Sequence, residues 1–497
     1  MLANNNLKLL AFVSLLFLLL PLSSWAQITL NDCDGDFVNQ RPGELIIDVL
    51  PTGIDDTLNI QCALEVAVNV GFPIVSLSAG DFFISHIFAE SFNGSLQGTT
   101  RVSTRVHVLD DSIDCSAMID QGLTPAAIKF SQGEPNLKFM QVSANAPCKN
   151  SWDLDILIHF TGKNANDPGC GFSVINGRVD RVDVLGPGHF GDVTHGIAAS
   201  AEGDLLGGCN VALLGGIKIN KSSISEFTIG AFTAMRSGAQ VDINFTKFMH
   251  NWISINVFES NQSATVTTNE FYLDESPPII ENSSVEGGNR IEHNNHSGAV
   301  GILVQTFIPT PPAKTRLVID NNKFYFSSTD PNEIIDGIHV ADFVGGHQVV
   351  SLAATNNVFN LDGPNIAGIW IDGVDNAAIS ANRFNGTAFA GIGLSTFQTP
   401  AASGSTITAN LGFAAFNGLD SDIRIEPGIT QAIVGPGQDA VVKNLGSGNT
   451  ILSVSPIDND TGLQAESYGK TREAQVVNRT HAVRESLARL MELRRRH

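Results

Sequence analysis

Short runs of alternating apolar and polar residues, separated by turn residues, make up most of the chain. A period of two is typical of β-strands rather than helices. An Asn followed closely by a Phe recurs along the second half, and the recurring Asn residues are Asn244, Asn269, Asn322, Asn357, Asn382 and Asn410, with Asn295 in the widest gap. Successive Asn residues are 25 to 28 positions apart, except for one interval of 35. The chain therefore repeats a unit of about 25 residues.

A second element, a Gly-Ile strand start, runs in phase with the first at Gly301, Gly337, Gly368 and Gly391. Three short strands in about 25 residues predict one coil of an all-β, right-handed parallel β-helix, here over residues 73–456. Leucine-rich repeats have a shorter period, and propeller blades have a longer one. We expect the recurring Asn to lie at a turn in a left-handed conformation, with its amide bonded to the Asn of the next coil.

The segment 27–72 before the first coil predicts a capping helix near residues 57–70. Ile60, Ala63, Leu64, Ala67 and Val68 form an apolar stripe at helical spacing. Residues 55–57 can cap its start, and a glycine at position 71 ends it. The apolar face of this helix would cover the open end of the β-helix.

This N-terminal order resembles the entry of the pectate-lyase-like right-handed β-helix proteins. The matching features are Asp55-Asp56-Thr57, the helix, Ala79-Gly80-Asp81-Phe82 and Leu96-Gln97-Gly98, followed by the Gly-Ile and Asn-x-Phe repeats. The resemblance covers about residues 53–455 and implies the fold and a polysaccharide along one strand face. It implies no reaction, because the paired-Asp, Gly-His-Gly and Arg-Ile-Lys pattern of polygalacturonases is missing.

Both ends of the chain differ from the repeat. Residues 1–26 contain Lys8, an apolar run from Leu9 to Leu20 and Pro21. They predict a signal peptide and an exported protein, periplasmic or extracellular. A run of 12 residues is too short to span a bilayer, and we expect no membrane segment in the mature chain. Residues 457–497 predict a polar linker and a basic amphipathic helical tail, either a cap over the last coil or a docking helix.

Charge and cysteine content narrow the partners. A net charge of −21 argues against a nucleic-acid partner, which needs a basic face. The six cysteines of an exported chain predict disulfides. Residues one coil apart lie close enough to bridge, which favours Cys33–Cys62, Cys115–Cys148 and Cys170–Cys209. A link between Cys148 and Cys170 is the competing arrangement.

One outward strand face carries the candidate chemistry. In a Gly-Ile-x-Val strand the residue x points outward, which predicts that His339 and Trp370 are neighbours on adjacent coils. Two residues further along are Gln305 and Asp372, while Asp342 and Asp375 lie near the strand ends. An exposed indole beside carboxylates suits a sugar site, with Trp370, Asp375 and Gln305 binding substrate. The alternative is that Trp370 lies under a loop and the Asp residues form turns.

Asp342 and Asp372 on adjacent coils could supply the two carboxylates of a glycoside hydrolase, with His339 beside them. A lyase is less favoured, because this face lacks an outward Lys or Arg. We expect neither a cofactor nor a metal. The leading hypothesis is a secreted protein that binds or cleaves an extracellular polysaccharide. The alternative is a non-catalytic surface or matrix protein, an adhesin-like spacer. The sequence does not indicate an oligomeric state.

Overall fold

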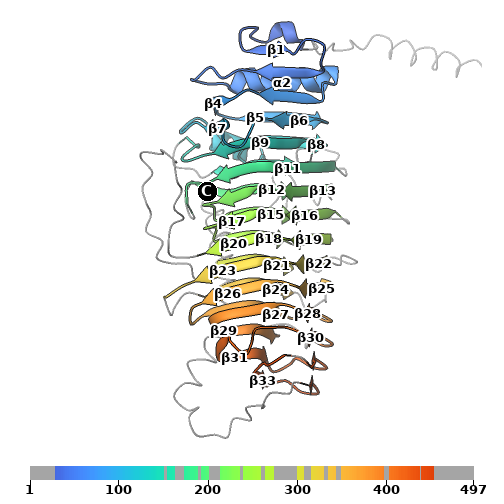
Figure 1. Cartoon of the computed structure of the whole chain (residues 1–497). Helices are drawn as coiled ribbons and strands as arrows, with labels where there is room; N and C mark the ends of the chain where they lie inside the picture. The colour runs from blue at the N-terminus through green and yellow to red at the C-terminus, as the bar shows by residue number, and fades with distance from the viewer. Residues whose placement is uncertain are drawn as a thin grey trace, which may run out of the picture.

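The computed structural model describes residues 28–149, 154–162, 173–188, 192–200, 213–234, 239–258, 263–273, 299–306, 315–329, 334–342, 349–396, 402–436 and 438–452. In these residues the chain winds into a column of stacked coils (Figure 1). The coils contribute strands to three parallel sheets, named A, B and C here. This pairing confirms the predicted parallel β-helix. At the N-terminal end β1 (Val38–Gln40) pairs antiparallel with β2 (Ile46–Val49).

Sheet A contains β5 (Ile87–Phe92), β8 (Ala126–Gly133), β10 (Leu154–Thr161), β12 (Val193–Ser200), β15 (Ile229–Ala234), β18 (Ile253–Phe258), β21 (Ala299–Thr306), β24 (Ile335–Asp342), β27 (Ile366–Asp372), the second part of β29 (Arg383–Ser395), β31 (Asn417–Ile425) and β33 (Val442–Asn444). Sheet C contains β4 (Gly80–Ile84), β7 (Thr104–Val108), the second parts of β9 (Asn136–Ser143) and β11 (Ser173–Leu185), β14 (Ser223–Ser225), β17 (Lys247–Met249), β20 (Glu270–Leu273), β23 (Lys323–Ser327), β26 (Val358–Asp362) and the first part of β29.

Sheet B begins with β2 and continues through β3 (Ile74–Leu77), β6 (Ser95–Gln97), the first parts of β9 and β11, β13 (Leu213–Asn220), β16 (Gln240–Asn244), β19 (Ser263–Thr267), β22 (Thr315–Asp320), β25 (Val349–Thr355), β28 (Ala378–Ser380), β30 (Thr406–Thr408), β32 (Ile433–Val434) and β34 (Thr450–Ile451). Because β9, β11 and β29 each run from one sheet into the next, they act as two strands of the coil.

The described helices are η1 (Leu30–Asp32), α2 (Thr57–Val70) and α3 (Cys115–Asp120). Helix α2 lies at the N-terminal end of the column (Figure 1), where the capping helix is predicted. It buries Ile60, Ala63 and Leu64, and it ends at Gly71 with φ of 82°. None of the described helices is long and apolar enough to cross a membrane.

Inward side chains form columns along the axis. On sheet A, register pairs Ile302 with Ile338, Ile338 with Ile369, and Ile369 with Ile392. All four side chains are fully buried. Since parallel coils stack at a constant rise, one apolar residue per coil at this position builds a continuous core. The Ile of each Gly-Ile start contributes the buried residue of this column.

The Asn-x-Phe repeat builds two further columns. The rings of Phe248, Phe271, Phe324, Phe359, Phe384 and Phe413 stack with centroids 4.7–5.2 Å apart. Asn269, Asn322, Asn357, Asn382 and Asn410 form a buried ladder in which each side-chain Nδ2 donates to the Oδ1 of the next Asn at 2.9–3.1 Å. The same Nδ2 also donates to a backbone carbonyl of the adjacent strand, as Asn357 does to Ile319. The predicted amide ladder is confirmed.

Two details of the Asn prediction are wrong. The left-handed residue is the one before each ladder Asn, for example Asn356 at φ 54° and Ala381 at φ 56°. Asn244 is not in the ladder, because Thr246 takes that place and donates its backbone N–H to the Oδ1 of Asn269 at 2.9 Å. Phe245, which follows Asn244, is accordingly exposed while Phe248 enters the stack. Asn295 lies outside the described residues.

Two of the three predicted disulfides are present. Cys33 bonds to Cys62 and ties the segment after η1 to α2, with a Cα–Cα distance of 5.8 Å. Cys115 bonds to Cys148 with a Cα–Cα distance of 5.6 Å, which removes the competing link between Cys148 and Cys170. The predicted Cys170–Cys209 pair, the predicted signal peptide over residues 1–26 and the predicted tail over residues 457–497 lie outside the described residues.

Candidate functional site

The predicted neighbours His339 and Trp370 do meet on the outward face of sheet A. They are register partners on β24 and β27, and Leu303 and Gly393 continue the same outward column. Asp372 lies two residues beyond Trp370 in the adjacent column, where its strand partner is Ala341. The alternation of β-strands therefore brings three of the six predicted residues together.

His339 is held between two carboxylates. Its Nδ1 lies 2.8 Å from Oδ2 of Asp336 on the same strand, and its Nε2 lies 3.1 Å from Oδ2 of Asp372 on the next coil. Burial alone would lower the pKa of His339, but hydrogen bonds and the charges of Asp336 and Asp372 outweigh it and raise the pKa to about 9. The imidazole therefore donates a proton from each nitrogen at neutral pH.

The expectation that Trp370 presents an exposed platform is wrong, because its side chain is fully buried. The indole packs with Ala367, Phe389 and Ala390 in an apolar cluster outside the main core. Its Nε1 donates to Oδ1 of Asp372 at 3.3 Å. On the next coil, a Cβ added to Gly393 would lie 2.2 Å from the indole, so this glycine makes room for the ring. The roles of these residues toward a sugar stay predictions.

Of the other predicted site residues, Asp375 has described side-chain contacts, and Gln305 and Asp342 are described by their backbone alone. Asp375 accepts hydrogen bonds from the backbone N–H of Ser403 at 2.7 Å and from its hydroxyl at 3.3 Å, as a turn residue does. Gln305 pairs with Ala341 in the Asp372 column, and Asp342 ends β24 opposite Thr306. Asp372 contacts His339 and Trp370, and the carboxylate of Asp336 contacts the other nitrogen of the same imidazole.

Sequence reasoning missed a second polar cluster in the same outward column. His159 Nε2 lies 3.0 Å from Oγ of Ser200, and Lys129 precedes His159 by one coil. All three residues are buried. Burial and then the Lys129 charge lower the pKa of His159 well below its usual value. One face of sheet A thus holds a neutral His159 and a charged His339, and their pKa values diverge because their neighbours have opposite charge.

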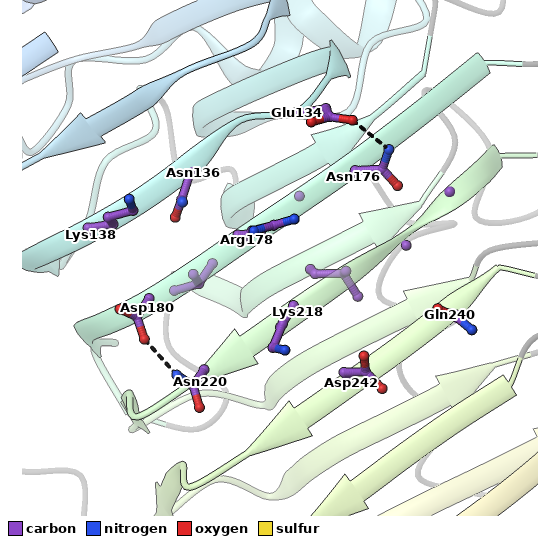
Figure 2. Close-up of a pocket in the computed structure, with 15 residues that line it drawn as sticks. Glu134, Asn136, Lys138, Asn176, Arg178, Asp180, Lys218, Asn220, Gln240 and Asp242 are labelled. Atoms are coloured by element: carbon purple, nitrogen blue, oxygen red, sulfur yellow. Dashed lines mark hydrogen bonds between the residues drawn. The ribbon is translucent and has the colours of Figure 1, made fainter. Parts of the chain in front are cut away.

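An open groove lies on sheet B, for which the sequence analysis makes no prediction. It has a volume of about 720 Å³ and crosses β9, β11, β13 and β16. Figure 2 shows its polar side chains projecting from these neighbouring strands. Gly216 is the register partner of Asn176 on one side and of Gln240 on the other. Because it has no side chain, it leaves space between them in the groove. The wall residues that carry charge are Glu134, Lys138, Arg178, Asp180, Lys218 and Asp242.

The charged groups of the groove are not equivalent. Asp180 accepts from Nδ2 of Asn220 at 2.7 Å and pairs with Arg181 at 3.4 Å. Glu134 accepts from Nδ2 of Asn176 at 3.4 Å (Figure 2). Among the described residues, no ion pair engages Lys138, Arg178 or Lys218. Arg178 and Lys218 are exposed, so their donors remain available to a ligand.

One signal in the sequence could have indicated this groove. Arg178 and Lys218 stand in Gly177-Arg178-Val179-Asp180 and Gly216-Ile217-Lys218-Ile219, two alternating runs 40 positions apart with a basic residue at the outward position. Recognising them as neighbours requires the length of the intervening loop, which the 25-residue period does not supply. Within the described residues, no group of three or more His, Cys, Asp or Glu side chains is placed to hold a metal ion.

The strand pairing makes this chain a parallel β-helix protein. No protein-family model and no curated protein matches the chain. Among solved structures, it is similar to the Dettilon tailspike protein (13% identity, 82% of this chain and 69% of the tailspike, TM-score 0.40). It is also similar to the catalytic unit of a GH87 α-1,3-glucanase from Streptomyces thermodiastaticus (13%, 85% and 72%, TM-score 0.42) and to the Streptococcus pneumoniae adhesin PfbA (12%, 81% and 97%, TM-score 0.40). At these values the likenesses carry no argument about function.

Proposed function

We propose that this protein is exported and binds an extracellular polysaccharide in the groove on sheet B. The observation that carries the proposal is the open, polar groove across four successive strands of one sheet. Asn, Gln, Lys, Arg and carboxylate side chains on a rigid scaffold supply the donors and acceptors that sugar hydroxyls require. The two disulfides among the described residues are typical of an exported protein.

The groove supports binding better than cleavage. Asp180 on β11 is the strand-register partner of Asn220 on β13, and Asp242 on β16 is the register partner of Lys218 on β13. The two carboxylates therefore lie two strands apart in sheet B. Two strand spacings amount to roughly 10 Å, beyond the carboxylate separation of about 5–5.5 Å in retaining hydrolases and at the limit for inverting ones. Asp180 is also engaged by Asn220 and Arg181.

The binding proposal is tested by obstructing the groove. The Asn176→Trp variant places an indole on the groove wall, and it should weaken binding of any glycan found by an array screen at least about tenfold. The matched control is Arg316→Trp, because Arg316 belongs to the same outward column of sheet B but lies beyond the groove. Equal binding by both variants and the parent protein would place the glycan elsewhere.

The hydrolase hypothesis keeps one testable residue, Asp372. If Asp372 acts as acid or base, Asp372→Asn should abolish release of reducing ends from the bound glycan while leaving its affinity unchanged. Full activity in this variant would remove Asp372 from the chemistry.

The second candidate function is a non-catalytic spacer, and the buried state of His339, Trp370 and Asp372 favours it over catalysis at that face. A protein that binds no glycan and releases no reducing ends would support the spacer.

A further inference from the structure

We infer that the groove on sheet B selects a polysaccharide whose sugars carry an anionic group, a carboxylate or a sulfate, and that the polymer runs along the β-helix axis. This inference rests on the proposed function. It concerns three cations on consecutive strands of one sheet: Lys138 on β9, Arg178 on β11 and Lys218 on β13.

Two like charges face each other across neighbouring strands of the groove. Arg178 and Lys218 are direct register partners, and both are exposed. Like charges directly opposite each other on neighbouring strands destabilise a sheet. Asp242 is the register partner of Lys218 on its other side, but no carboxylate stands beside Arg178 in this column, where its other partner is Asn136. An anion between Arg178 and Lys218 would relieve their repulsion.

On the outer face of sheet C, a column of charged residues alternates in sign. There Glu270 stands between Lys247 and Lys323 in register, and its carboxylate pairs with Lys247 at 3.6 Å and with Lys323 at 3.3 Å. The cations of that column alternate with a carboxylate. Arg178 and Lys218 have no carboxylate between them in register, although Asp242 follows Lys218 on the next strand. Where two cations meet in register on sheet A, at Arg424 and Lys443, Asp420 pairs with both, whereas no ion pair among the described residues joins Arg178 or Lys218 to a carboxylate.

The groove wall differs from the rest of the chain in its balance of charged groups. The whole chain has 29 Lys and Arg against 50 Asp and Glu, whereas the groove wall has three of each. Asp180 and Glu134 accept hydrogen bonds from the protein, so the groups left open to a ligand are mainly cationic. An Arg and a Lys in this state bind carboxylates and sulfates through charge-assisted hydrogen bonds.

Arg178 and Lys218 lie in one column, one strand spacing of about 4.8 Å apart, whereas Lys138 lies two residues to the side on the preceding strand, in register with Asp180. This spacing is comparable with the length of one pyranose residue, so a polymer along the axis can bring the anionic groups of two successive sugars to Arg178 and Lys218. Figure 2 shows Arg178 and Lys218 in the middle of the groove, between Asp180 on one side and Gln240 on the other, with Lys138 on the side of Asp180.

The experiment uses matched polymers and the intact protein. Dextran, xylan and a soluble β-glucan are each compared with their carboxymethylated and sulfated derivatives by isothermal titration calorimetry. We expect at least one derivative to bind about tenfold more tightly than its neutral parent, and the stronger of the two derivatives identifies the anion. Neutral parents that bind as tightly as their derivatives would overturn the inference and keep the proposed function. If no member of this panel and no glycan on the array binds, the proposed function itself fails.

Substitution of the cations then tests whether the anion binds in the groove. The double variant Arg178→Gln, Lys218→Gln should lose the preference for the derivative, while Arg383→Gln, an exposed cation on sheet C, should keep it. The thermal midpoint of Arg178→Gln should not fall, because the register partners of Arg178 are Asn136 and Lys218 and the change removes a like-charge neighbour. A double variant that retains the full preference would show that the anion binds outside the groove.

Discussion

At the scale of the residue, the glycine of each Gly-Ile start packs against the phenylalanine ring of an Asn-x-Phe unit. A Cβ added to Gly337 would lie 2.9 Å from the ring of Phe359, and one added to Gly368 would lie 2.6 Å from the ring of Phe384. The ring enters the interior from sheet C and fills the space beside the glycine of sheet A. The two repeats therefore run in phase because each requires the other.

The left-handed residue before each ladder Asn allows a test at one position. Ala381 and Asn356 occupy equivalent places on successive coils, and both are exposed. An L-residue other than Gly, Asn or Asp in this conformation costs about 1–2 kcal/mol. Ala381→Asn should therefore raise the free energy of unfolding by about 1 kcal/mol in urea denaturation. The reverse change, Asn356→Ala, should lower it, and a gain in stability there would contradict the explanation.

The charged His339 predicts a loss of stability at alkaline pH. Its folded pKa of about 9 lies above the unfolded value near 6.5, so its stabilisation is complete below about pH 6.5 and disappears as the pH rises through 9. The free energy of unfolding should fall over this interval. In His339→Gln this part of the decline should be absent, although the variant should be less stable by about 3–5 kcal/mol because two buried carboxylates lose their partner. An unchanged pH profile in the variant would exclude His339 as the cause.

At the scale of the element, the asparagine ladder joins the turns between sheets B and C. Asn357 donates its backbone N–H and its Nδ2 to Oδ1 of Asn382, and its own Oδ1 accepts the equivalent pair from Asn322. Each coil is thus bonded to the next by side chain and backbone together. The ladder ends at Gln438, whose Oε1 accepts from Asn410.

Removing one rung of the ladder should be costly. Asn357→Ala leaves buried donors and acceptors unpaired on both sides, and should lower the free energy of unfolding by about 3 kcal/mol. Asn360→Ala is the matched control, because Asn360 forms a single side-chain bond with Asn385 on the outer face of sheet C. That change should cost no more than about 0.5 kcal/mol in the same chemical denaturation series. Equal losses would show that burial of the ladder is unimportant.

The elements could be predicted because their signal is periodic, whereas the site could not. Ile338 and Ile369 repeat at one place in each coil, and their burial follows from alternation alone. The same alternation placed His339 beside Trp370 correctly. It could not show that Trp370 is buried, because the covering of an outward side chain depends on tertiary contacts such as Phe389, not on strand period. The Arg178–Lys218 pair was missed because long connections separate its strands.

At the scale of the whole molecule, the two described disulfides both lie in the N-terminal half, while the later coils rely on their ladders. Stability in a repeat architecture is close to a sum of local and nearest-neighbour terms. The Cys33–Cys62 bond therefore should act on the cap formed by α2 rather than on the distant coils.

Replacing Cys33 and Cys62 by Ser tests this locality. The cap should lose about 3–4 kcal/mol, the value expected for a closed loop of this size. Hydrogen exchange should speed up for the amides of α2 and stay unchanged for those of β27. The Cys115→Ser, Cys148→Ser variant serves as control and should leave α2 protected. Uniform acceleration along the column would show that it unfolds as one cooperative unit instead.

The asparagine ladder has one consequence for the length of the molecule. Every interior rung gives the following rung the same bonds that it receives from the preceding one. Inserting or deleting one entire coil would leave each donor with an acceptor, whereas a fraction of a coil would strand amides in the interior. Descendants of this protein can therefore lengthen or shorten the β-helix only by whole coils, each about 4.8 Å along the axis.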